Sequence, residues 1–467
     1  MERRGGKRST RFVPLALAML TTASHGCFSL QNPYDQALCK AGCPNGQHCF
    51  AGRCVGATDG GPSDALLGDA PATCNNNDNL DPGEQCDGDK LGGASCATLG
   101  YLAGSLSCSD RCTFQGCSLQ VLGTASALAA SGNVQREPSA ATLNGQFTIV
   151  WQEQAASGGI LFAARLSKLG QLLDSQPLRF CASESVRSSA SIASGDGSYA
   201  VVWQEIVAGN TKLAGAILPL TLSPANCHQS LLSTSTDPQR PALLPRALGF
   251  ELLWDAATAG AKRAAFSAQR NSDLTSKDVP TEINTDAGDQ ISIRAVATAA
   301  GARFAVWQNA GAGQWDIGGA LSATSVTPLT IAQTAATETV PDVATSGQDV
   351  LVVWRAEQSG DQAIFARGYR ADGTPQGQAL IVDSWAQSVV SAPRVRYFNG
   401  EFWLAWVRGT TLHLQRVDAN GQLKASRVTL RQGVAVDGLA LTAMPDALLV
   451  AWGEGQPAQI YRQVISR

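Results

Sequence analysis

Charged residues recur in the C-terminal three quarters of the chain at spacings that would place them on equivalent turns of a repeat. Arginine dominates this set, and clustered guanidinium groups can bind carboxylate, sulfate or phosphate through paired N–H donors. The alternative is a solvated rim whose charges pair with one another, and this simpler interpretation is favoured. The residues that we expect at one shared mouth are Glu137, Arg187, Arg240, Arg294, Asp342 and Arg394.

Acidic residues beside a repeated tryptophan raise a second kind of chemistry. Glu153 and Glu205 each stand two positions after a tryptophan, and we place them at the same mouth. A polysaccharide hydrolase needs two carboxylates about 5–10 Å apart across one cleft, and no motif singles out such a pair. We therefore predict a protein that is not an enzyme and that binds a glycan, peptide or protein. A polysaccharide-processing hydrolase or lyase using Glu153 and Glu205 is the alternative.

Other catalytic motifs are missing or incomplete. The repeats contain only two histidines, His228 and His413, and neither adjoins a nucleophile or an acid. The segment SGDGSYAVVW approaches the Asp box of sialidases, but Ser198 stands where that motif has its second glycine. The chain has no HExxH, P-loop or GxGxxG motif. We therefore expect no cofactor and no catalytic metal.

A tryptophan motif, written VVWQE in its second copy, supplies the framework for these residues. Its copies follow one another at intervals of 46–53 residues, and a period near 40–50 with several short strands is typical of propeller blades. No helical periodicity accompanies it. The sequence predicts an all-β, seven-bladed β-propeller over residues 118–467, with one large aromatic side chain packed between each pair of blades. These tryptophans are Trp151, Trp203, Trp254, Trp307, Trp354, Trp406 and Trp452.

Turn residues divide each repeat into four strands. Asn144-Gly145, Asp372-Gly373 and Asn399-Gly400 are typical hairpin turns. The last repeat ends with its third strand at 458–467, whereas the segment SLQVLGTASALAA (118–130) precedes the first repeat as a spare strand. We expect this N-terminal strand to complete the last blade, because ring closure removes exposed strand edges.

The 13 cysteines indicate an oxidising compartment and small disulfide modules. Residues 39–54 are too few to build a hydrophobic core and need disulfides instead. The cysteine spacings around His48 do not match a zinc site, and residues 55–73 have the composition of a flexible linker. Two isolated cysteines, Cys181 and Cys227, lie in the outer parts of neighbouring repeats and are a candidate disulfide. The remaining disulfide candidates are Cys39, Cys43, Cys49 and Cys54 in the first module, and Cys74, Cys86, Cys96, Cys108, Cys112 and Cys117 in a second module over 74–117.

The second module resembles a known family. Its segments DPGEQCDG, LGGASCATLGY and LSCSDRCTFQGC are similar to the cysteine-rich repeat common in myxobacterial surface proteins, which implies a stalk or display module. Oxygen-bearing side chains alternate over 75–84 as they do in a calcium loop. Leu80, however, stands where an EF-hand loop needs glycine, so turn-forming Asn and Asp residues are favoured over a Ca²⁺ site.

The N-terminus is typical of an exported bacterial protein. Residues 1–26 combine a basic run, a short apolar stretch and small residues, as a signal peptide does. Gly26-Cys27 resembles a lipobox, whose lipidated cysteine would account for the odd cysteine count. Phe28 follows instead of the aspartate that retains lipoproteins at the inner membrane, so the family rule implies an outer-membrane or cell-surface lipoprotein. A secreted protein is the alternative, and a net charge of −3 argues against nucleic acid as a partner.

Overall fold

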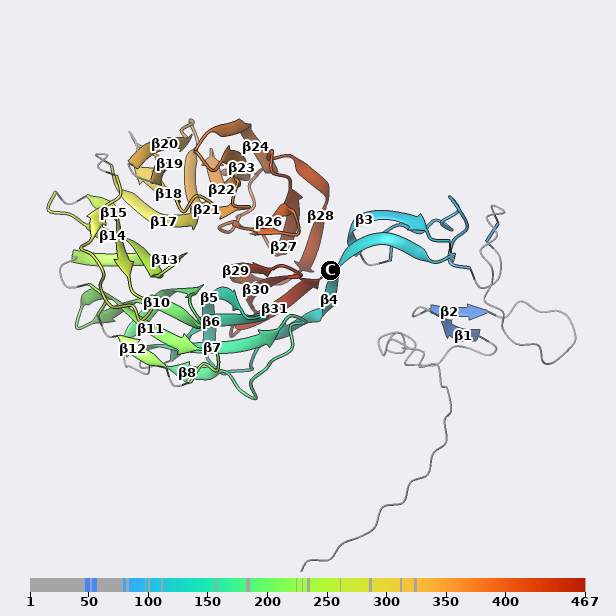
Figure 1. Cartoon of the computed structure of the whole chain (residues 1–467), viewed down its shortest axis with the longest axis horizontal. Helices are drawn as coiled ribbons and strands as arrows, with labels where there is room; N and C mark the ends of the chain where they lie inside the picture. The colour runs from blue at the N-terminus through green and yellow to red at the C-terminus, as the bar shows by residue number, and fades with distance from the viewer. Residues whose placement is uncertain are drawn as a thin grey trace, which may run out of the picture. The chain divides into compact units, whose positions relative to one another are not determined.

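Seven antiparallel β-sheets are arranged around a ring in the computed structural model of this chain (Figure 1). The structure describes residues 47–50, 53–56, 79–80, 84–96, 98–99, 101–110 and 112–466, with gaps in the last range at 156–157, 182–184, 224, 229, 233–235, 261, 285–287, 311–312 and 323–325. The chain divides into two units, 1–71 and 72–467. The predicted signal peptide, Cys27, Cys39, Cys43, Cys74 and most of the linker lie outside the described residues.

The first unit contributes a short hairpin, in which β1 (Gln47–Phe50) pairs with β2 (Arg53–Gly56). Cys49 and Cys54 occupy paired positions in the register of these two strands.

Six blades of the second unit are built from consecutive strands, so each repeat folds as one meander. Blade 1 comprises β5 (Val134–Leu143), β6 (Gln146–Ala155), β7 (Gly158–Ser167) and β8 (Leu178–Phe180). Blade 2 comprises β9 (Val186–Ser194), β10 (Ser198–Val207), β11 (Asn210–Pro219) and β12 (Asn226–His228). Blade 3 comprises β13 (Thr236–Arg246), β14 (Gly249–Ala257), β15 (Arg263–Arg270) and β16 (Thr281–Glu282). Blade 4 comprises β17 (Gln290–Ala297), β18 (Arg303–Ala310), β19 (Trp315–Ser322) and β20 (Val326–Ala332). Blade 5 comprises β21 (Thr337–Thr345), β22 (Asp349–Gln358), β23 (Asp361–Arg370) and β24 (Pro375–Ala386). Blade 6 comprises β25 (Arg394–Phe398), β26 (Glu401–Arg408), β27 (Thr411–Val417) and β28 (Leu423–Gln432).

Blade 7 joins the two ends of the ring. Its strands β29 (Val436–Met444), β30 (Ala447–Glu454) and β31 (Gln459–Ser466) come from the C-terminus, and its outer strand β4 (Phe114–Ala127) comes from before blade 1. The pairing of β31 with β4 runs from Tyr461↔Ala127 to Ser466↔Gln120. The earlier half of β4 pairs instead with β3 (Tyr101–Cys108), which extends this sheet to five strands. The prediction of an all-β seven-bladed propeller is confirmed, and no helix occurs among the residues described.

Tryptophan side chains fill the spaces between blades. All seven of the repeated tryptophans are at most 2% exposed. In blades 1, 3 and 5 the indole stacks on a phenylalanine directly opposite on the third strand, as Trp151 does on Phe162 with ring centroids 5.9 Å apart. In blade 4 the residue opposite Trp307 is Gly318, where an added Cβ would lie 2.9 Å from the indole nitrogen. Burial of one such ring per blade explains why the motif repeats.

Two of the expected Asn-Gly turns have the geometry that this dipeptide favours. Asn144 and Gly145 have φ of 49° and 73°, and Asn399 and Gly400 have φ of 52° and 82°. Positive φ at both central residues is the requirement of a type I′ hairpin. At Asp372-Gly373 only the glycine has positive φ, because that turn is one residue longer and Arg370 N–H donates to Thr374 O at 2.8 Å.

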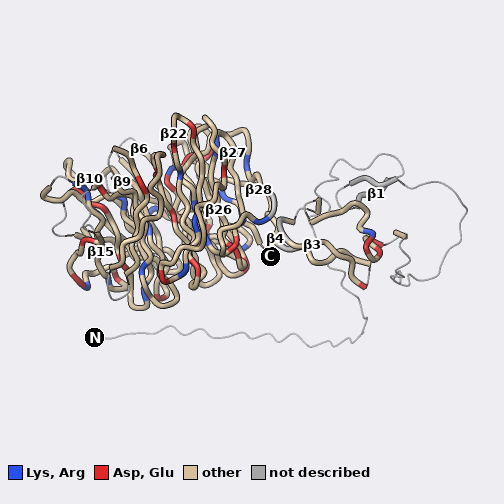
Figure 2. The backbone as a smooth tube through the Cα atoms, turned by 90° about the horizontal axis from the view of Figure 1, so that it is seen from above, with Lys and Arg blue, Asp and Glu red and all other residues tan. Residues whose placement is uncertain are grey.

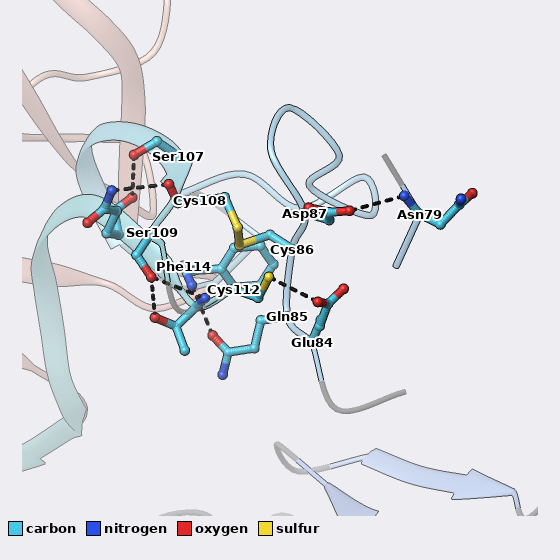
Figure 3. Close-up of a disulfide and its surroundings, with 12 residues drawn as sticks. Asn79, Glu84, Gln85, Cys86, Asp87, Ser107, Cys108, Ser109, Cys112 and Phe114 are labelled. Carbon is cyan, nitrogen blue, oxygen red and sulfur yellow. Dashed lines mark hydrogen bonds between the residues drawn. A yellow bond between two sulfur atoms is a disulfide. The ribbon is translucent and has the colours of Figure 1, made fainter. Parts of the chain in front are cut away.

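Disulfides hold the cysteine-rich segment and one edge of the propeller. Cys86 bonds Cys108, the last residue of β3, and Cys96 bonds Cys117. Figure 3 shows the first of these disulfides. A further disulfide joins Cys181, just after β8 of blade 1, to Cys227 in β12 of blade 2, with Cα atoms 5.8 Å apart. Such bonds indicate an extracellular or other oxidising compartment. Within the described ranges, no helix is long and apolar enough to cross a membrane.

Candidate functional site

A central channel of about 680 Å³ lies between the first strands of the seven blades. The innermost position of these strands follows from the sheet order, in which β5, β9, β13, β17, β21, β25 and β29 each form one edge of their blade. Over the whole propeller, acidic and basic residues are interspersed (Figure 2). The channel is the place where charged side chains of several blades converge.

A β-bulge interrupts the first strand in six of the blades. Each bulge contains one residue with positive φ, and the ladder to the second strand shifts register there. A bulge places two residues opposite one and re-aims the side chains that follow it. The positive-φ residues are Glu137, Ser189, Arg240, Ser292, Val340 and Gly438.

The bulge separates residues that the sequence pattern had placed together. Arg187 precedes its bulge and pairs across the sheet with Glu205, whereas Glu137 and Arg240 occupy the bulge itself. Three residues come after the bulge or at its equivalent in blade 6, each opposite the residue before the blade's tryptophan: Arg294, Asp342 and Arg394. These three lie on the neighbouring blades 4, 5 and 6.

Arg294, Arg394 and Arg396 surround Asp342 in the channel, and we call these four residues the arginine cluster. Asp342 Oδ2 accepts hydrogen bonds from Arg396 at 3.1 Å and from the Val395 backbone N–H at 2.9 Å. The other two guanidinium groups donate to backbone carbonyl oxygens, Arg394 to Leu439 at 3.1 Å and Arg294 to Ile293 at 2.8 Å. Three cations therefore share one carboxylate.

The electrostatics of the arginine cluster reflect this shortage of negative charge. Arg294 is enclosed by the blades but keeps an accessible surface toward the channel. Burial, reinforced by the like charges of Arg394 and Arg396, lowers the pKa of Arg294 to about 10, although Asp342 opposes the shift. Burial likewise lowers the pKa of Arg394. An added anion would relieve the repulsion and satisfy N–H donors that have weak protein partners.

Arg240 and Glu137 line the same channel but already have partners. Arg240 binds Asp255 through two hydrogen bonds of 2.8 and 2.6 Å, and Asp255 also accepts from Arg263 at 2.7 Å. Asp255 is fully buried, so this group holds blade 3 together. Glu137 is exposed and accepts a 2.5 Å hydrogen bond from the Ser189 backbone N–H of blade 2.

The remaining predicted residues lie inside the blades. Arg187 is 3% exposed, its Nε is 3.0 Å from Glu205 Oε1, and its guanidinium lies 5.2 Å from the centroid of the Trp203 ring. Glu153 is 8% exposed and accepts hydrogen bonds from Ser131, Asn133 and Gln135. Neither Glu153 nor Glu205 is among the residues lining the channel.

The alternation of side chains along each strand predicts both the position of Glu153 and Glu205 between the blades and the presence of Arg396 in the channel. Glu153 and Glu205 stand two residues after a tryptophan and so share the tryptophan's face between the blades. Arg396, which the sequence interpretation missed, stands two residues after Arg394 on β25 and shares its face. His413 packs against the Trp406 ring, with centroids 5.4 Å apart, and has no catalytic partner among the contacts described.

Within the described ranges, no group of three or more His, Cys, Asp or Glu side chains could hold a metal ion. Of the segment 75–84, where the sequence favours turns over a Ca²⁺ site, only residues 79, 80 and 84 are described. Asn79 there uses its backbone N–H to donate to Asp87 Oδ2 at 3.2 Å.

Comparisons with known proteins give only distant similarities. No family model matches the chain, and no curated protein matches it. The chain is similar to a thermostable family-43 glycoside hydrolase, with 10% sequence identity and a TM-score of 0.37. The match covers 56% of this chain and 96% of that chain. It is similar to a Trypanosoma rangeli sialidase, with 8% sequence identity and a TM-score of 0.40. The match covers 77% of this chain and 56% of that chain. It is also similar to the endosialidase of phage phi92, with 8% sequence identity and a TM-score of 0.43, over 74% of this chain and 69% of that chain.

These comparisons correct one prediction from the sequence. The prediction that this protein is not an enzyme is contradicted, because the solved structures named above are of a glycoside hydrolase and of sialidases. It is therefore withdrawn. At 8–10% identity the likeness concerns the propeller fold, and the matched region spans little more than half of the Trypanosoma rangeli sialidase.

Proposed function

We propose that the central channel binds an anionic glycan, whose carboxylate or sulfate group is held by Arg294, Arg394 and Arg396. The observation that carries this proposal is the excess of guanidinium groups around a single carboxylate, Asp342. Guanidinium groups bind oxyanions through two parallel N–H donors, which gives orientation as well as affinity. A channel of about 680 Å³ lies in the size range of sites that take small ligands or the end of a longer chain.

Binding can be measured by calorimetry with oligogalacturonate and chondroitin sulfate oligosaccharides, with maltohexaose as the neutral comparison. The test variant is Arg294→Gln, and the control is Arg370→Gln, an exposed arginine at the end of β23 in blade 5. Loss of one charged hydrogen-bonding group is worth about 1.5–3 kcal/mol, a loss of affinity of roughly tenfold to a hundredfold. Equal binding of maltohexaose, or equal affinity of Arg294→Gln and the parent, would contradict the proposal.

Cleavage of the bound glycan is a second candidate function. It is favoured by two carboxylates, Glu137 and Asp342, that line the same channel. Glu153 and Glu205 are weaker candidates for such chemistry, since each is engaged by donors within its own blade. Release of reducing ends from the same oligosaccharides tests this function. We expect any turnover to fall in Glu137→Gln while oligosaccharide binding persists, and turnover that instead requires Glu205 would reject this assignment.

We also propose that the propeller is displayed at the cell surface by a lipid on Cys27, with the cysteine-rich segment as its stalk. The proposal is supported by the Gly26-Cys27 lipobox resemblance and by disulfides that need an oxidising compartment. Several acyl chains anchor a protein stably. A Cys27→Ser variant should lose acyl labelling and leave the membrane fraction, whereas a parent protein found free in the medium would favour simple secretion.

A further inference from the structure

A second cavity, of about 340 Å³, lies between the outer part of blade 4 and blade 5, away from the central channel. One side comes from β20 and the segment that follows it, including Gln333 and Thr334, and the other from β23 and β24. We call this the interblade cavity. It contains a carboxyl group, Glu338 of β21, that is only 1% exposed.

Glu338 is distinguished from the other buried acids of the described propeller by a carboxylate oxygen that has neither a cation nor a hydrogen-bond donor beside it. Its Oε1 accepts a hydrogen bond from Thr334 Oγ1, and its Oε2 has no hydrogen-bond partner among the described residues. Six buried acids contact at least one arginine, and Glu153 is satisfied by neutral donors. The six are Glu205, Glu251, Asp255, Asp342, Asp383 and Glu454.

A second carboxyl group near Glu338 also lacks a positively charged partner among the described residues. Asp316 of β19 in blade 4 is 7% exposed and forms no salt bridge within the described part of the chain. Burial and the neighbouring Asp316 charge raise the pKa of Glu338. Arg367 lines the interblade cavity, but its guanidinium donates to the carbonyl oxygens of Ile331 and Gly377. Within the described chain, these two carboxyl groups thus lack the arginine partner that six other buried acids of the propeller have.

The wall of the interblade cavity is aromatic. Trp354 stacks on Phe365 at 5.8 Å between centroids, and Phe365 meets Trp385 edge to face at 5.7 Å. Aromatic rings attract organic cations through their π-faces and pack against apolar groups. A bare metal ion would use neither the aromatic wall nor a cavity of this volume, and it prefers more oxygen ligands than two carboxylates.

We propose that the interblade cavity binds a small organic cation, a primary amine on an apolar or ring-shaped body, whose ammonium group becomes the counter-ion of Glu338. The amine body packs on the Phe365–Trp385 wall, and the exposed Gln333 and Gln378 at the rim offer hydrogen bonds to its polar groups. Cation binding at this site is independent of the anion site in the central channel. No covalent step is involved.

The test uses the whole exported protein and saturation-transfer NMR with two amines, phenethylamine and glucosamine. Their neutral counterparts are 2-phenylethanol and glucose, and calorimetry with CaCl₂ tests for binding of a metal ion instead. The test variant is Glu338→Gln. Its matched control is Glu357→Gln, an exposed glutamate on β22 of the same blade. Circular dichroism and thermal melting of each variant verify that the propeller is folded.

We expect at least one amine to bind the parent protein and the Glu357→Gln variant alike, and to bind Glu338→Gln roughly tenfold to a hundredfold more weakly. The corresponding neutral compound should bind no better to the parent than to Glu338→Gln. Three results would overturn the proposal. They are amine binding unchanged in Glu338→Gln, Glu338-dependent binding of Ca²⁺ instead of amines, and no binding of either amine to the folded parent.

Discussion

Removal of the Cys181–Cys227 disulfide should destabilise the propeller by an amount that the structure allows us to estimate. The bond links residues 46 positions apart, across the outer edges of blades 1 and 2. In the chain-entropy treatment, a closed loop of that length restricts the unfolded state by about 4 kcal/mol at 25 °C. Cys227 is exposed and Cys181 half-buried, so their replacement removes little packing, and the cross-link itself should dominate the loss.

The outer strands explain why this edge needs a cross-link. Strands β8 and β12 are only three residues long each, whereas the outer strands β24 and β28 have 12 and 10 residues. Short strands contribute few ladder hydrogen bonds to hold the edge of a blade. The disulfide therefore reinforces an edge that has little backbone pairing on either side.

The assay is urea unfolding of the parent and of a Cys181→Ala/Cys227→Ala variant, followed by tryptophan fluorescence. We expect the variant to be less stable by about 4 kcal/mol without reductant. With a reductant present, both proteins have unlinked unfolded chains, and their stabilities should converge. A loss below about 1 kcal/mol, or a difference that persists after reduction, would refute the chain-entropy reasoning for this edge.

Three further outcomes are expected. Asp255→Asn should lower the free energy of unfolding by about 3–5 kcal/mol in chemical denaturation, because it removes the buried carboxylate that Arg240 and Arg263 share, and only Arg263 has another acidic partner, Asp237. A loss under about 1 kcal/mol would contradict this. Gly318→Ala should cost about 1–3 kcal/mol by thermal melting, since its Cβ would lie 2.9 Å from Trp307, whereas Gly132→Ala, with open space around it, should be neutral. Burial raises the pKa of Glu338, so its protonated form favours folding at low pH and that contribution is lost as pH rises. The free energy of unfolding of Glu338→Gln should therefore increase relative to the parent from pH 5 to pH 8, and a constant difference would show that Glu338 does not titrate with folding.

The number of blades and their order could be predicted from the sequence alone. One tryptophan per repeat reports a burial that each blade needs, because every blade must pack a large side chain against the next. The last repeat lacks a fourth strand, and a spare strand precedes the first repeat. Together they indicated ring closure, because an open ring leaves two unpaired strand edges. Cys181 and Cys227 occupied comparable outer positions in successive repeats, which made their disulfide a reasonable candidate.

The composition of the site depended on the tertiary structure. A bulge in the first strand shifts the alternation by one residue, so Arg187 turns toward Glu205 inside blade 2 while Arg294 of blade 4 reaches the channel. The sequence shows the residues on either side of a bulge but carries no clear mark of the bulge itself. Contacts between blades are equally hidden. Glu338 and Asp316 belong to different repeats, and the packing of β19 in blade 4 against β21 in blade 5 brings their carboxyl groups close together. The repeat pattern thus determined the scaffold, whereas strand irregularities and blade packing decided which charges face one another.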